Sequence, residues 1–152
     1  MSPRLHRGMI GGDVLWVTRP HCHVDRTACA WAIQRFVDQD ATFGFAPDLK
    51  SARALGGTPF DMLGAELGHH EGRCSFESLL LAYRLDDPAL RELAEVVHEA
   101  DIDDDRFHTL EASGLDAVIR GLGMVVKDDL ELFGVTHRLY DGLHAWFSRT
   151  VT

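Results

Sequence analysis

Apolar and polar positions follow two different periods along the chain, that of strands near the N-terminus and that of helices afterwards. Short β-rich runs predict strands over residues 14–18, 41–46 and 64–70. Between the first two runs, apolar side chains recur at helical spacing up to Asp38, and Asp25 stands where a helix N-cap is expected. A short helix is expected over 50–55, before Gly56. The first half therefore predicts a small sheet with two or three strands.

The second half of the chain is helical in pattern. A start signal is present where Asp87 precedes Pro88, because Asp caps a helix and Pro suits its first position. The apolar stripes of four helices are Phe76, Leu79, Leu80 and Tyr83; Leu90, Leu93, Ala94 and Val97; Leu115, Val118, Ile119, Leu122 and Val126; and Leu132, Val135, Leu139, Leu143 and Trp146. We therefore predict a predominantly helical α+β fold, with residues 1–152 forming one domain and residues 1–12 a flexible N-terminus.

Composition and charge exclude several classes of protein. Hydrophobic residues make up 45% of the chain and charged residues 26%, as in a soluble globular domain. The net charge of -9 argues against direct nucleic-acid binding, which requires a basic face. No stretch approaches the ~20 apolar residues of a membrane span. Three cysteines do not make a disulfide framework of the secreted kind, so we expect a cytoplasmic protein.

Ionisable residues at positions expected to face the core are the main indication of a functional site. Such groups are costly to bury unless they are paired or bind a metal. On a helical wheel Asp101 falls within the apolar stripe of its helix and His98 at the edge of that stripe. Both side chains are therefore candidates for one site. The alternative is a helix-terminal aspartate turned to solvent beside a surface histidine.

A second set of candidates surrounds two adjacent histidines, His69 and His70. An extended chain would send their side chains to opposite faces, whereas a turn at Gly68 would let both imidazoles converge. Neutral imidazole is a common metal ligand, and Cys74 and Glu77 could add a thiolate or a carboxylate. Exposed loop histidines beside a buried free cysteine are the alternative.

A third set precedes the first helix. His23 and Asp25 are candidate metal ligands, although Asp25 as a plain N-cap is the simpler interpretation. Arg26 could pair with a carboxylate or bind an oxyanion near the helix N-terminus, where the backbone amides favour negative charge.

Several stretches of the chain, in order, carry a family resemblance. They are Trp16-Val17-Thr18-Arg19, His23-Val24-Asp25-Arg26, Thr58-Pro59-Phe60-Asp61, Glu66-Leu67-Gly68-His69-His70, Leu85-Asp86-Asp87-Pro88, Val97-His98-x-Ala100-Asp101 and Gly114-Leu115-Asp116-Ala117. Together they resemble the chromate resistance protein family, the C-terminal domain of ChrB-type chromate-responsive regulators. The resemblance implies a bacterial cytoplasmic protein linked to chromate resistance, without a known reaction. It implies no direct DNA binding here, since that would belong to an additional N-terminal region of the regulators.

Two functional hypotheses and one structural alternative follow. In the first, a sensor or accessory module binds a metal ion or a small oxyanion such as chromate in a pocket built from His23, Asp25, His69, His70, Glu77, His98 and Asp101, with Arg26 as a candidate ligand of the oxyanion. In the second, two or three of these residues hold a divalent metal in a hydrolytic or redox enzyme, with a remaining carboxylate such as Glu77 as general base on bound water. Mixed donors suit zinc, iron and copper about equally. The alternative is a buried network without a ligand, and the sequence leaves a homodimer open.

Overall fold

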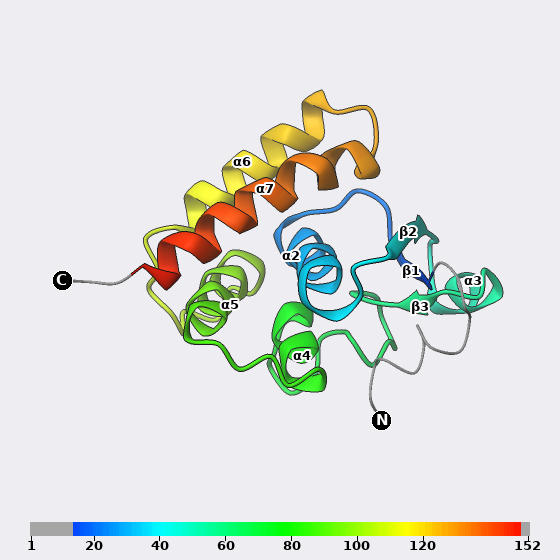
Figure 1. Cartoon of the computed structure of the whole chain (residues 1–152), viewed down its shortest axis with the longest axis horizontal. Helices are drawn as coiled ribbons and strands as arrows, with labels where there is room; N and C mark the ends of the chain where they lie inside the picture. Colours follow the sequence, from blue (N-terminus) through cyan, green and yellow to red (C-terminus); the bar gives the residue numbers. More distant parts are fainter. Residues whose placement is uncertain (1–13, 150–152) are drawn as a thin grey trace.

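A parallel sheet of three strands lies at one end of the molecule (Figure 1). The computed structural model describes residues 14–149, so the expectation for residues 1–12 lies outside the described part. The strands, in the order β2-β1-β3 across the sheet, are β1 (Val14–Thr18), β2 (Ala41–Phe45) and β3 (Thr58–Pro59). Trp16 in the central strand is paired with Phe43 on one side and Thr58 on the other. The predicted α+β class is confirmed.

Helices make up most of the described chain. They are α2 (Val24–Ala32), continued by a π-helical turn η1 (Ile33–Val37), α3 (Leu49–Ala54), α4 (Ser75–Ala82), α5 (Pro88–Asp101), α6 (Ala112–Val125) and α7 (Asp129–Ser148). In Figure 1, α6 and α7 lie side by side along one edge, and α2 occupies the middle. Within residues 14–149, no helix is long and apolar enough to cross a membrane.

Helix α2 forms the centre of the core. All of its residues except Arg26 are buried, and Trp31 is 1% exposed. The C-terminal helix packs across it through polar contacts as well as apolar ones. The Tyr140 hydroxyl donates to the Val24 carbonyl at 2.9 Å, and Trp31 Nε1 donates to Asp141 at 2.9 Å. These contacts fix α2 against α7. The side chains of the first turn of α2 are therefore held in position to contact other elements.

The predicted third strand at 64–70 is wrong. The third strand is β3, and segment 64–70 contributes only two isolated bridges, Phe60 with Leu67 and His70 with Arg73. Gly64 has a φ of +85°, and a Cβ on Gly68 would lie 3.0 Å from the Ala65 carbonyl oxygen, so this segment follows tight turns. The chain can therefore direct the side chain of His69 back toward α2.

Candidate functional site

Asp25 lies in the first turn of α2 and is 2% exposed. The N-cap of α2 is His23, not Asp25 as the sequence predicted. The Asp25 carboxylate instead accepts hydrogen bonds from the first backbone amides of α4, from Ser75 N at 2.9 Å and Phe76 N at 2.8 Å. These amides have no partner within their own helix, and a carboxylate at a helix N-terminus is favoured by the helix dipole. Asp25 therefore joins α2 to the start of α4.

His69 brings a third element to Asp25 and reaches a fourth. Its Nε2 atom lies 3.1 Å from Asp25 Oδ2 and 2.9 Å from Asp101 Oδ2, at the last residue of α5. The ligand atoms of Asp25, His69 and Asp101, which we call the Asp–His–Asp cluster, all lie within 4.8 Å of one another. The side chain of His69 is 51% exposed and that of Asp101 27%, so the cluster opens to solvent.

A further aspartate, Asp61, borders this cluster. Its Oδ1 accepts a hydrogen bond from the Ser75 hydroxyl at 2.6 Å, and its Oδ2 accepts one from Arg26 Nε at 2.9 Å. The remaining nitrogens of Arg26 donate to the carbonyls of Arg19, Pro20 and Asp61. Arg26 thus forms an ion pair with Asp61, and its donors are already engaged by protein oxygens.

The carboxyl groups of this region lack sufficient counter-charge. Burial, followed by the negative charge of Asp25, raises the pKa of Asp101 to about 7. The same two causes raise the pKa of Asp61. The hydrogen bond with Asp25 raises the pKa of His69 to about 9, although partial burial acts against it. Asp101 and His69 therefore retain protons readily, and these protons supply positive charge that a bound metal cation could supply instead.

Another group of ligand atoms lies beside the start of α4. Cys74, Glu77 and His98, which we call the Cys–Glu–His cluster, also place one ligand atom each within 4.8 Å of the others. His98 is fully buried, with Nδ1 2.6 Å from Glu77 Oε1 and Nε2 2.8 Å from Asp104 Oδ2. Burial alone would lower the pKa of His98, but the hydrogen bonds with Glu77 and Asp104 raise it above its ordinary value. With a carboxylate at each ring nitrogen, the metal-free imidazole is favoured in its charged form.

Several of the residues singled out in the sequence lie in one of these two clusters. Asp25, His69 and Asp101 meet in one, and Glu77 and His98 in the other. The burial of the two α5 residues is the reverse of what the helical wheel predicted. His98 is fully buried, whereas Asp101 is partly exposed. The reason is that α5 packs against four helices, α2, α4, α6 and α7, so its buried face is wider than its apolar stripe.

The other two predicted histidines lie outside both clusters. His23 is exposed. Partial burial, followed by the charges of Arg120 and Arg26, lowers its pKa, and the effect of Arg120 indicates that His23 lies on the side of α6. His70 is exposed, with Nε2 2.8 Å from the Ala65 carbonyl oxygen. Sequence reasoning assigned no role to Asp61 or Asp104. Asp61 follows Pro59-Phe60 in one of the stretches of family resemblance, and Asp104 belongs to the acidic run 101–105, where charge alone singled out no member.

The titration of His69 predicts the pH dependence of stability in the metal-free protein. Its pKa is about 9 in the folded protein and 6.5 ordinarily, so its contribution is complete below about pH 6.5 and is lost as the pH rises through about 9. Urea unfolding of wild type and His69→Ala at several pH values measures this. The difference in unfolding free energy should shrink from about pH 6 to about pH 9.5. A difference that is constant or grows with pH would contradict the assignment.

Comparison with known proteins identifies the family. The family described as "ChrB, C-terminal domain" matches residues 16–147. Protein ChrB of Cupriavidus metallidurans is 39% identical over 136 residues, which cover 88% of this chain and 40% of that protein. The chain thus spans about two fifths of the length of this relative, and no solved structure matches. The chain belongs to the ChrB-type chromate resistance family, as a ChrB C-terminal domain.

Proposed function

We propose that this chain is a cytoplasmic, chromate-responsive sensor or accessory module that binds a divalent transition metal at the Asp–His–Asp cluster. The observation that carries the proposal is the position of His69 Nε2, within 3.1 Å of Asp25 Oδ2 and 2.9 Å of Asp101 Oδ2. Nitrogen and oxygen donors of this kind suit zinc and iron, and also copper. The three cysteines are free, which agrees with a reducing compartment.

The charges of the site favour a cation over a directly bound oxyanion. Three carboxyl groups, those of Asp25, Asp61 and Asp101, act on one another electrostatically, and a dianion among them would be repelled. Arg26, the candidate anion ligand, is committed to Asp61 and to backbone carbonyls. A metal held by three protein ligands would supply positive charge and keep a coordination position open. Chromate would then bind as a ligand of the metal.

The two other interpretations have less support. Hydrolytic chemistry with Glu77 as general base would require this carboxylate near the metal, but Glu77 Oε1 contacts His98 Nδ1 and the Cys74 amide. A network without a ligand accounts for the buried contacts of Asp25. It gives no reason for the half-exposed imidazole of His69 to lie between the buried carboxylate of Asp25 and the partly exposed one of Asp101.

Elemental analysis of retained zinc tests the metal site. Wild type dialysed against zinc should retain metal, and His69→Ala should retain one equivalent less. His70→Ala is the matched control, because His70 is the adjacent histidine and contacts only a backbone carbonyl. It should retain metal as wild type does. Equal zinc content in wild type and His69→Ala, or none in either, would overturn the proposal.

Equilibrium dialysis of chromate tests the sensing step. Zinc is the suitable metal, because chromate oxidises iron(II). Zinc-loaded wild type should retain chromate, whereas metal-free wild type and His69→Ala should not. Equal retention by zinc-loaded and metal-free protein would show that chromate binds without the metal and would contradict this mechanism.

A further inference from the structure

We propose that the Cys–Glu–His cluster is a second metal site, which binds zinc or another thiophilic divalent metal through Cys74 Sγ, a Glu77 carboxylate oxygen and His98 Nδ1. These ligand atoms come from the start of α4 and from α5, and each lies within 4.8 Å of the others. The donor set contains sulfur, unlike that of the Asp–His–Asp cluster, and a mixture of S, N and O ligands is typical of zinc. The inference does not depend on the proposed function.

The surroundings of His98 are those of a metal-binding histidine. Such residues usually donate the N–H of their other ring nitrogen to a carboxylate, which fixes the ring and its tautomer. Asp104 Oδ2 lies 2.8 Å from His98 Nε2, while Nδ1 faces Glu77 at 2.6 Å. The imidazole ring also packs edge-to-face with the ring of Phe107, with centroids 5.0 Å apart. This contact helps to fix the orientation of the imidazole. Nδ1 is thus the nitrogen directed at the other ligands.

Cys74 is suited to bind as a thiolate once a cation is present. It is the N-cap of α4, where the helix dipole favours negative charge, and it is fully buried. Without metal, burial and then the charges of Asp25 and Glu77 raise the pKa of its thiol well above the ordinary range. A coordinated cation deprotonates a thiol outright. Binding would replace the thiol proton of Cys74, and also a proton of His98 where the imidazole is charged, so at least one proton leaves per metal.

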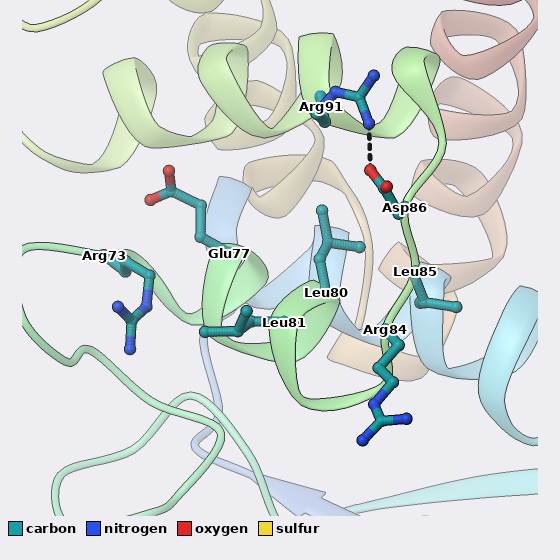
Figure 2. Close-up of a pocket in the computed structure, with 8 residues that line it drawn as sticks. All are labelled: Arg73, Glu77, Leu80, Leu81, Arg84, Leu85, Asp86 and Arg91. Atoms are coloured by element: carbon teal, nitrogen blue, oxygen red, sulfur yellow. Dashed lines mark hydrogen bonds and ion pairs between the residues drawn. The ribbon is translucent and has the colours of Figure 1, made fainter.

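Two surface features border the ligands of this cluster. Asp104 belongs to an exposed acidic loop with Asp103 and Asp105, which raises the local concentration of cations. In addition, Glu77, alone among the three ligands, lines a pocket of about 370 Å³ beside α4 (Figure 2). Its carboxylate points away from Arg73, which is itself paired with Glu71.

Cobalt(II) is the probe that tests this site, because a thiolate bound to cobalt gives a charge-transfer band in the near ultraviolet. Cobalt-loaded wild type should show the band and Cys74→Ser should not. Cys22→Ser is the matched control, since Cys22 is a buried free cysteine outside the cluster, and it should keep the band. Asp104→Asn should weaken cobalt binding about 10- to 100-fold, as loss of a carboxylate behind a ligating histidine does.

The outcomes separate this site from the other cluster. His69→Ala should retain the band even where it loses a metal equivalent, because His69 is not among the sulfur-site ligands. If Cys74→Ser does not fold, calorimetry of zinc binding to His69→Ala in two buffers gives the proton count, expected to be at least one. Cobalt-loaded wild type without the band, a band that persists in Cys74→Ser, or zinc binding to His69→Ala without proton release would overturn the inference.

Discussion

Replacing Asp25 by alanine is expected to lower the free energy of unfolding by about 3 to 5 kcal/mol, the usual cost of removing one partner of a buried charged contact. The substitution removes the acceptor of Ser75 N and Phe76 N and leaves both amides buried without a partner. It also removes one carboxylate from His69 Nε2. Urea unfolding of the metal-free protein, with chelator present, measures the loss.

Two further variants make this experiment decisive. Asp25→Asn keeps one oxygen as an acceptor and should lose less stability than Asp25→Ala. Asp103→Ala removes an exposed aspartate, and it should change the unfolding free energy by less than about 0.5 kcal/mol. A loss below about 1 kcal/mol for Asp25→Ala would contradict the claim that this residue holds the start of α4.

His98→Ala is expected to have an effect of similar size, about 3 to 5 kcal/mol in the metal-free protein. His98 is fully buried, so its loss leaves a cavity, and the carboxylates of Glu77 and Asp104 lose the imidazole that both contact. Because Asp104 would lose its contact with α5, amide exchange in residues 102–111 should also become faster. Chemical denaturation and hydrogen exchange measure the two effects.

The exposed histidine His108 gives the matched control for this variant. Its side chain is 78% exposed and lies 3.7 Å from Asp105, in the same loop. His108→Ala should leave both the unfolding free energy and the exchange rates nearly unchanged, since exposed ion pairs contribute little. Equal effects of the two substitutions would show that the buried imidazole does not anchor the loop.

Features of the fold that depend on local sequence were predicted well. The start of α5 is one of them, because Asp87 accepts a hydrogen bond from Ala89 N and Pro88 occupies the first turn. The face that α7 buries was predicted less well, since Val135 and Trp146 are 39% and 53% exposed. Tyr140 is buried in their place, because its hydroxyl bonds to a carbonyl in α2. A contact across 116 residues cannot be read from hydrophobic period alone.

In the candidate site, too, the sequence indicated local features but not tertiary contacts. Residue types singled out the clusters, because buried or crowded ionisable groups need partners. The partners themselves come from tertiary packing. Asp25 had the sequence context of an N-cap for its own helix, yet it accepts hydrogen bonds from the amides of a helix 50 residues further on. The separation of His69 from His98 into two clusters likewise depends on how α4 meets α2 and α5.

The central claim, a metal at the Asp–His–Asp cluster, is tested most directly by anomalous diffraction from crystals grown with zinc. We predict an anomalous peak within coordination distance, about 2.0 to 2.2 Å, of His69 Nε2 and of oxygens from Asp25 and Asp101. The peak should be absent from crystals of His69→Ala. Crystals of the wild type in which His69 still contacts both carboxylates directly, with no anomalous peak between them, would contradict the account.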